Sequence, residues 1–406
     1  MNYISALVYA LILLSMLIGM KFAPRSRFNE ESLSLDAMTC LKGLMALFVV
    51  FHHLSQKKLF QETDTIAFFE FIGFLFVGVF FFTSGYGLYK SFLTKENYLK
   101  NFLRHRLLPI IISYYVMIAI YALYYLVSGN DFSLSEWIFK LSGLVLINSQ
   151  AWFIPVINLM YLAFYFVFKS EKLRKHGIMI LLALTLLQGF LFCVINHFPW
   201  YLGEESGWWL KDGAFDNLPW WRGFCQLPFE GEWWVNSTIG FVFGIYFAEH
   251  EESFLAWISK KFAVKFIISL IVFAAASALG LFCLWHIGYW TEFSGKLGFF
   301  DKLICYAVQC VQVVVTDIFI VIVMRKVYVR NSFYAFLGKR ALEMYLMQEI
   351  ALFGWLFLIE KDGKPIFKPN NWNAVAYLLL VLASVTCAAV IYGMINRSLS
   401  KKLRRV

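Results

Sequence analysis

Long apolar runs recur along almost the whole chain and constrain its fold more than any other feature. Most are roughly 17 to 22 residues long, the length that an α-helix needs to cross a hydrocarbon core of about 30 Å. A lone strand would leave backbone groups unpaired in lipid, so the runs are expected to be helical. The sequence predicts an all-α, polytopic membrane bundle of about eleven transmembrane helices. Their ranges are 4–22, 41–54, 68–89, 107–127, 151–168, 178–198, 235–247, 266–285, 304–324, 341–358 and 374–395.

The composition separates this chain from soluble proteins. Hydrophobic residues make up 60% of it and charged residues 15%, whereas a soluble domain is about half apolar and about a quarter charged. The net charge of +10 raises nucleic-acid binding as an alternative. Because the basic residues cluster at the ends of apolar runs, cytoplasmic loops explain the charge better. We therefore expect contact with membrane lipids and no nucleic-acid partner.

The basic clusters also predict an orientation. All six fall on one side if the N-terminus is outside and the C-terminus is cytoplasmic, and basic loops remain on the cytoplasmic side of a membrane. A single missed crossing would break this agreement. We expect a multi-pass protein of the inner (plasma) membrane. The clusters lie at 21–27, 90–106, 169–175, 260–265, 325–330 and 401–405.

The first apolar run is expected to be a retained helix. It has neither the basic segment nor the Ala-x-Ala cleavage site of a secretory signal. The seven cysteines form no CxxC pair, and most lie inside apolar runs, where cysteine behaves as a small hydrophobic residue. The sequence predicts neither a disulfide framework nor a metal site.

The run at 41–54 carries ionisable residues, which are costly in a membrane and therefore functional candidates. Lys42 and His53 are eleven residues apart, so on a helix they share one face, about 16 Å apart along the axis. His52 points about 100° away from that face. In the alternative interpretation, Lys42 extends to the lipid headgroups and the histidines end the helix at the outer interface.

Several stretches in order along the chain resemble the membrane acyltransferase-3 family. They are Lys42-Gly43 with the apolar run to His53, VGVFFFTSGYGL at 77–88, FLRHRLLP at 102–109, AWFI at 151–154, GFVFG at 240–244 and FLGKRALEMYL at 336–346. The resemblance implies three parts of the chain. Residues 1–35 form an extra helix with a basic connector, 36–396 an acyltransferase-3-like membrane domain, and 397–406 a basic cytoplasmic tail.

The sequence departs from the family pattern at several positions. Thr39 stands where the family often has Asp, and Leu103 where it usually has Arg. Ile157 and Asn158 replace a frequent Glu-Glu pair, and Gln348 replaces a frequent His. We therefore expect an acceptor site that differs from those of better-known branches.

The resemblance implies transfer of an acyl group, usually acetyl from cytosolic acetyl-CoA, to a hydroxyl of an envelope glycan or glycolipid. Arg104 and Arg106 are expected to bind CoA phosphates, for which guanidinium geometry is suited, and Lys42 would add a point charge. The alternative for all three is their place in basic cytoplasmic loops.

His53 is the candidate for the chemistry. Imidazole can take the proton of a hydroxyl that attacks the thioester, and a covalent acyl-histidine is the other mechanism that the residues allow. Either Asp36 or Glu70 is considered as the carboxylate that orients the imidazole.

Four further residues are candidate substrate contacts. Ser84 and Tyr86 lie at a polar break in a Phe-rich run, where a partner helix or the pantetheine arm could approach closely. Asn148 and Trp152 lie at the outer start of a run and are expected to touch the acceptor. The alternatives are helix packing for Ser84 and Tyr86 and interfacial anchoring for Trp152.

The large outer loop at 199–234 holds seven tryptophans and six acidic residues. Aromatic side chains that stack on sugar rings are one interpretation, and an interfacial aromatic belt is the other.

Two other classes of function remain alternatives. A transporter or flippase for a polysaccharide or lipid-linked precursor would usually show repeated halves, and the sequence shows no clear repeat. A non-catalytic sensing domain would not need His53.

Overall fold

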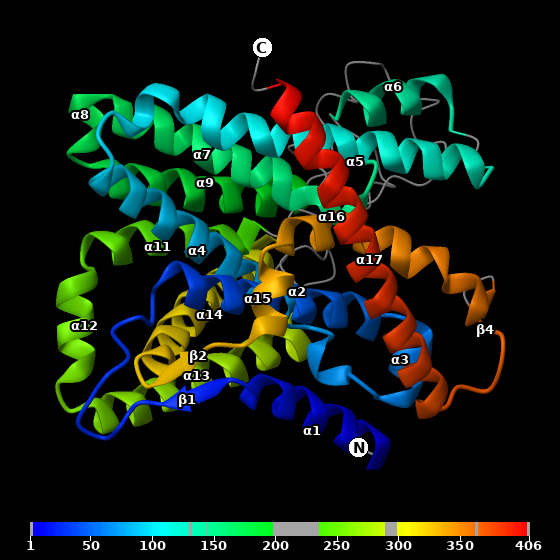
Figure 1. The fold of residues 1–406 in the computed structure, drawn as a ribbon, viewed down its shortest axis with the longest axis horizontal. Coiled ribbons are helices and arrows are strands. Elements are labelled where there is room, and N and C mark those ends of the chain that lie inside the picture. Colours follow the sequence, from blue (N-terminus) through cyan, green and yellow to red (C-terminus); the bar gives the residue numbers. More distant parts are fainter. Residues whose placement is uncertain are drawn as a thin grey trace. The chain divides into compact units, whose positions relative to one another are not determined.

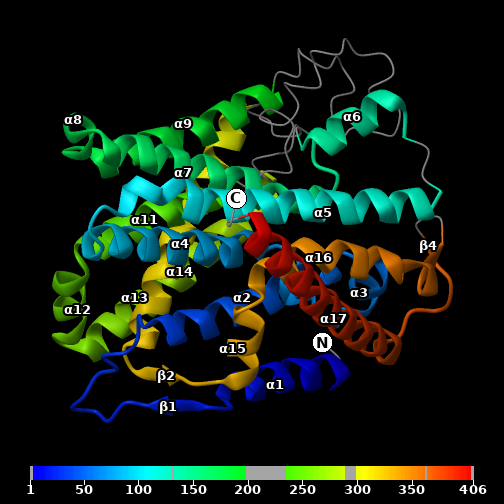
Figure 2. The same ribbon diagram turned by 45° about the horizontal axis from the view of Figure 1, so that its top comes forward.

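The structure is a computed structural model that describes residues 3–129, 132–143, 145–197, 235–288, 299–361 and 364–403. The tryptophan-rich loop at 199–234, for which sugar stacking is one interpretation, therefore lies outside the described residues. The chain divides into two compact units. The terminal unit comprises Met1–Phe80 and Ile318–Val406, and the central unit comprises Phe81–Asp317. Each unit is built almost entirely from helices (Figures 1 and 2).

The terminal unit contains both ends of the chain. Its elements are α1 (Tyr3–Leu17), β1 (Met20–Phe22), α2 (Leu35–Ser55), α3 (Lys58–Thr63), η1 (Ala67–Phe69), β2 (Val327–Val329), α15 (Ser332–Gly338), α16 (Ala341–Gly354), η6 (Leu356–Leu358), β3 (Glu360–Lys361), β4 (Lys364–Pro365) and α17 (Asn371–Leu403). The division between the units falls inside α4 (Gly73–Thr94) and α14 (Phe299–Met324).

The central unit holds the remaining helices. They are η2 (Tyr98–Asn101), η3 (Leu103–Leu107), α5 (Leu108–Val127), α6 (Leu134–Ser142), η4 (Ser149–Trp152), α7 (Phe153–Lys169), α8 (Glu171–Arg174), α9 (Gly177–His197), η5 (Val235–Thr238), α11 (Ile239–Glu249), α12 (Glu251–Ser259) and α13 (Phe262–His286). Within this unit α7 and α9 run side by side (Figures 1 and 2).

The all-α class is confirmed, and a helix lies in each of the eleven predicted ranges. Among the described residues, seven helices are long and apolar enough to cross a membrane. They are Leu35–Ser55, Leu103–Val127, Ser149–Lys169, Phe262–His286, Phe300–Met324, Ala341–Leu358 and Asn371–Leu399. Tyr3–Leu17 in α1 and Gly177–Cys193 in α9 are shorter apolar stretches. The count of eleven and the orientation of the termini remain predictions.

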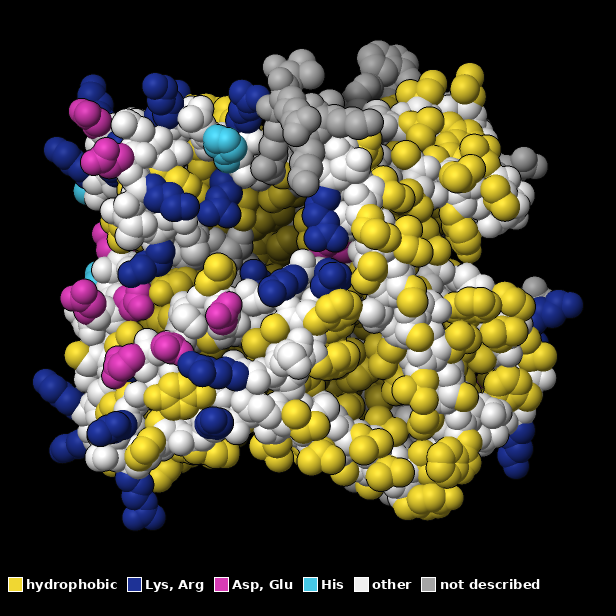
Figure 3. Space-filling model, in the orientation of Figure 1, with side chains coloured by type: hydrophobic (Ala, Val, Ile, Leu, Met, Phe, Trp, Pro, Cys, Tyr) yellow, Lys and Arg dark blue, Asp and Glu magenta, His cyan; other side chains and the backbone are white. Residues whose placement is uncertain are grey.

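The surface agrees with a membrane environment. Apolar side chains cover much of the face drawn in Figure 3, whereas Lys and Arg side chains gather around α8. The span Phe262–His286 has only 6% of its most apolar segment buried. Such a continuous apolar surface would be a liability in water and is the normal surface of a helix in lipid.

The predicted C-terminal boundary of the first helix was wrong. The helix ends at Leu17, because Gly19 adopts the left-handed region with φ of +78°. Met20–Phe22 then pairs antiparallel with Val327–Val329 as the β1–β2 ribbon. Backbone pairing with a segment far along the chain has overridden the local apolar pattern here.

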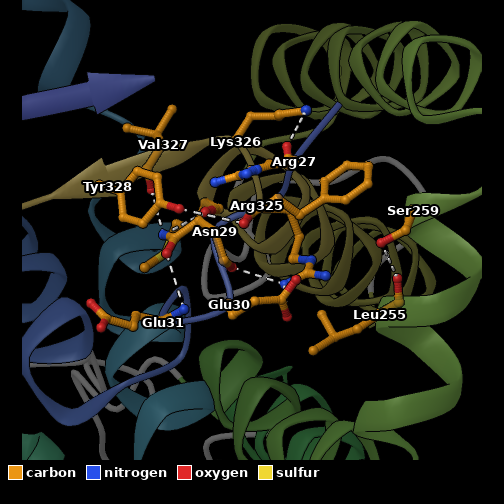
Figure 4. Close-up of polar contacts among 12 residues, drawn as sticks. Arg27, Asn29, Glu30, Glu31, Leu255, Ser259, Arg325, Lys326, Val327 and Tyr328 are labelled. Atoms are coloured by element: carbon orange, nitrogen blue, oxygen red, sulfur yellow. Dashed lines mark hydrogen bonds and ion pairs between the residues drawn. The ribbon is translucent and has the colours of Figure 1, made fainter. Parts of the chain in front are cut away.

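The connector after β1 is bound tightly to the end of α14 (Figure 4). Asn29 is 1% exposed, and its Nδ2 donates to the carbonyl oxygens of Met324 at 3.1 Å and Val327 at 2.8 Å. Arg325 donates from Nη1 to the carbonyl oxygen of Asn29 at 2.8 Å and pairs with Glu30 at 3.2 Å. The bond to Met324 satisfies a carbonyl group that the end of α14 leaves without a partner within the helix.

Replacing Asn29 by alanine should destabilise the protein by about 1 to 3 kcal/mol, because buried carbonyls would lose their donor. The melting temperature of the purified protein in detergent measures this. Glu31→Ala is the matched control, since its pair with Arg330 joins side chains that are 62% and 71% exposed and is expected to contribute about 0 to 1 kcal/mol. Equal melting temperatures for Asn29→Ala and the wild type would contradict the prediction.

Helix α2 is positioned by two glycines that let it touch α15. A Cβ atom on Gly43 would collide with the carbonyl oxygen of Tyr334, and one on Gly338 would collide with that of Thr39. The backbones of the two helices are therefore in direct contact, a packing mode that small residues allow in membranes. This contact fixes the helix that carries Lys42 and His53.

Gly338→Ala should lower the stability of the protein by about 1 to 3 kcal/mol, because the added methyl group overpacks a backbone contact. The readouts are the melting temperature and the monodisperse fraction in size-exclusion chromatography. Gly87→Ala is the control, because a Cβ at Gly87 meets no described atom within 4 Å. If the two variants melted alike, the contact between α2 and α15 would not be tight.

Candidate functional site

His53 lies in the last turn of α2 in the terminal unit. The helix begins after Ser34, whose side chain accepts a hydrogen bond from the backbone nitrogen of Ala37 at 3.3 Å, and it continues to Ser55. Lys42 and His53 are therefore on one unbroken helix, about 16 Å apart along its axis. The predicted helix is confirmed, and it starts earlier than the sequence indicated.

His52, next to His53, is fixed at both ring nitrogens. Its Nδ1 lies 2.9 Å from the carbonyl oxygen of Phe69, and its Nε2 lies 3.3 Å from Nε2 of Gln56. Because the amide nitrogen donates, we assign Nε2 as acceptor and Nδ1–H as donor to the carbonyl. The ring centres of His52 and His53 are 4.9 Å apart. His52 is thus tied to the backbone, which leaves His53 as the better candidate for proton transfer.

A cation and carboxylates lie near this end of α2, and the sequence analysis did not assign them a role. Nζ of Lys57 is 4.1 Å from the ring centre of Phe353 on α16. The charge of Lys57 interacts electrostatically with the carboxylates of Glu360 and Glu349 and with the imidazole of His53. Burial lowers the pKa of Lys57, and the two carboxylates oppose this shift. Lys57 and Glu349 are far apart in sequence, so no local motif links them.

One carboxylate considered for orienting His53 is in the wrong place. Asp36 is in the first turn of α2, seventeen residues before His53, which places it about 25 Å away along the helix. Glu70 accepts a hydrogen bond from Gln61 at 2.9 Å. Its role near His53 remains a hypothesis.

Arg106 lies in the central unit on a π-helical turn, Leu103–Leu107. Pro109 follows and has no N–H to donate to the carbonyl of His105, which favours a wider turn at this point. Arg106 donates from Nε to the hydroxyl of Tyr98 at 2.8 Å and from Nη2 to that of Ser91 at 3.4 Å. Arg104, on the same turn, is exposed. Two guanidinium groups on one irregular turn are suited to contact phosphate.

Ser84 and Tyr86 bond to other side chains of the central unit. Ser84 Oγ lies 2.6 Å from the hydroxyl of Tyr161, which interacts electrostatically with Arg106. Tyr86 donates to Glu251 Oε2 at 3.1 Å, and Lys90 pairs with the same oxygen at 2.8 Å. Tyr161 links the two predicted residues Ser84 and Arg106.

Tyr161, Tyr98 and Glu251 were missed by the sequence analysis. Each lies on a different element from its partner, so helical periodicity carries no signal for these contacts.

Asn148 and Trp152 are buried at the start of α7. The side chain of Asn148 accepts a hydrogen bond from the backbone nitrogen of Gln150 at 2.8 Å and so begins the turn η4. The ring of Trp152 lies 6.5 Å from that of Phe81, and the indole is buried rather than exposed as an interfacial anchor would be. Both residues shape this turn, and their contact with an acceptor remains a prediction.

The predicted site residues are divided between the two units. Lys42 and His53 belong to the terminal unit, and the other candidates belong to the central unit. In the central unit Ser84 and Arg106 are brought together through Tyr161. Within the described ranges, no group of three or more His, Cys, Asp or Glu residues could hold a metal ion.

Comparison with known proteins identifies a family for this chain. The sequence model of a family described as an acyltransferase domain, acyltransferase-3, matches residues 35–394. No curated protein and no solved structure matches the chain. The matched range leaves out α1 and β1 and includes every candidate site residue.

Proposed function

Because this chain belongs to the acyltransferase-3 family, we propose that it transfers an acyl group, acetyl in the simplest case, from cytosolic acyl-CoA to a hydroxyl of an envelope glycan or glycolipid. The observation that carries the proposal is a histidine in the last turn of a membrane-spanning helix of this family domain. The protein would work in the plasma membrane.

In the proposed reaction, His53 takes the proton of the acceptor hydroxyl as the oxygen attacks the thioester carbonyl. The bond from carbon to sulfur then breaks, the acyl group remains on the acceptor oxygen, and CoA leaves as a thiolate that takes up a proton. In the alternative, His53 is acylated first and passes the group on.

The other residues have binding roles in this proposal. Arg104 and Arg106 bind phosphates of the donor by charge-assisted hydrogen bonds, and Lys42 contributes a positive charge. The remaining candidates contact the pantetheine arm or the acceptor. They are Ser84, Tyr86, Asn148 and Trp152.

The direct test is transfer of label from radioactive acetyl-CoA by the purified protein, with cell-envelope extract as acceptor. Label that enters glycan or lipid would support the proposal. No transfer by well-folded wild-type protein, with acetyl and longer acyl donors alike, would overturn it.

A further inference from the structure

Helix α14 presents polar side chains on its buried side within a membrane-spanning segment. Lys302, Gln309 and Thr316 recur every seven residues, so they share one face of the helix. Gln312 and Asp317 flank this line, and Asp317 is 1% exposed. On the opposite side Val311 is apolar and 57% exposed. A membrane helix with polar residues inward and apolar residues outward typically borders a path for polar groups.

The short helix η5 lies against this line within the central unit. Its residues Asn236, Ser237 and Thr238 are all fully buried. Asn236 donates from Nδ2 to Oε1 of Gln309 at 2.8 Å, and the thiol of Cys310 donates to the carbonyl oxygen of Asn236 at 3.7 Å. The side-chain and backbone amide groups of Asn236 therefore connect η5 to α14.

Several buried oxygen atoms here are not satisfied by the protein. In the part of the chain that the structure describes, both carboxylate oxygens of Asp317 and the Oδ1 atom of Asn236 lack a hydrogen-bond partner. Polar side chains that only hold helices together are normally paired with one another, because an unpaired buried polar atom is costly. The unpaired oxygens are acceptors, which fits a ligand that supplies donors.

We propose that α14 and η5 border a hydrated path that takes an uncharged ligand segment rich in hydroxyl and amide groups. Amide side chains such as Asn236 and Gln309 both donate and accept, and the carboxyl of Asp317 accepts from hydroxyl or amide N–H groups. The choice of ligand class rests on the proposed function. Two substrates of an acyl transfer from CoA to a glycan carry this chemistry, namely the pantetheine arm of the donor and the sugar of the acceptor.

Cysteine accessibility tests the path on the full-length protein in lipid nanodiscs. The variants Thr316→Cys and Gln309→Cys report on the polar line, and Val311→Cys reports on the exposed apolar side as a matched control. A small cationic methanethiosulfonate reagent is applied, and modification is located by peptide mass spectrometry, so the native cysteines stay in place. Thr316→Cys is nearly isosteric and should fold normally, and Gln309→Cys provides a second, independent reporter.

We expect the thiols at 316 and 309 to react at least about tenfold faster than the thiol at 311, because the reactive thiolate forms in water and is suppressed in lipid. Rates at 316 and 309 as slow as the rate at 311 would overturn the path. Slower labelling in the presence of pantetheine would indicate that the path takes the pantetheine arm of the donor. Slower labelling in the presence of N-acetylglucosamine would indicate that it takes the sugar of the acceptor. A path that labels rapidly with no protection by either probe would overturn the ligand class.

The labelling does not require acyl transfer. Rapid, protectable labelling in a protein that transfers no acyl group would therefore overturn the proposed function and leave the path intact.

Discussion

Replacing His53 by alanine is expected to lower the rate of acyl transfer by about 10²- to 10⁴-fold, the usual contribution of a general acid–base residue. The imidazole is in the last turn of α2 and is not needed for the contact of that helix with α15. The variant should therefore insert, remain monodisperse and bind acyl-CoA as the wild type does. The measurement is label transfer from acetyl-CoA at saturating donor concentration.

His52→Asn is the matched control, because an asparagine amide can replace the Nδ1–H donor to the carbonyl of Phe69. We expect it to retain most of the activity. Equal losses in both variants, or a larger loss at His52, would contradict the assignment of His53. Intact-protein mass spectrometry without acceptor then separates the two mechanisms, since a stable acyl adduct on His53 would indicate covalent catalysis.

Replacing Arg106 by methionine is expected to raise KM for acetyl-CoA by about tenfold to a hundredfold, the range for loss of a charge-assisted hydrogen bond. The effect should disappear with acetyl-pantetheine, a donor that lacks the nucleotide and its phosphates. This comparison separates phosphate binding from a structural role, because Arg106 also bonds to Tyr98 and Ser91. If Arg106 had only a structural role, its replacement would raise KM for both donors alike, and that outcome would contradict the prediction.

Arg174→Met is the control for the loss of one positive charge in the central unit. Arg174 donates to the carbonyl oxygen of Phe168 at 2.8 Å and lies over the ring of Phe92. We expect KM for acetyl-CoA to stay near the wild-type value in this variant. A comparable rise in KM would indicate that general electrostatic attraction, rather than contact with Arg106, holds the donor.

The sequence by itself determined where the long apolar helices of this protein lie and how residues are spaced along each one, whereas shorter helices such as α6, α12 and α15 were not predicted. A run of apolar residues long enough to cross the membrane has one good solution for its backbone, so the all-α class and the presence of a helix in each of eleven ranges could be predicted. The ends of the first two helices differ from the prediction, and the number of crossings stays a prediction. The same local rule placed Lys42 and His53 on one helix. The ordered motifs were sufficient to indicate the acyltransferase-3 family.

Only the tertiary structure decided what lies beside each candidate residue. Three such contacts join segments that are far apart in the chain. Asn29 bonds to the end of α14, Lys57 lies over the ring of Phe353, and the hydroxyl of Tyr161 bonds to Ser84. The early end of the first helix has the same cause, because β1 pairs with β2. Local periodicity reports which face of a helix is apolar, whereas the partner of that face is selected by packing and hydrogen bonding of the whole chain, and no short stretch of sequence encodes it.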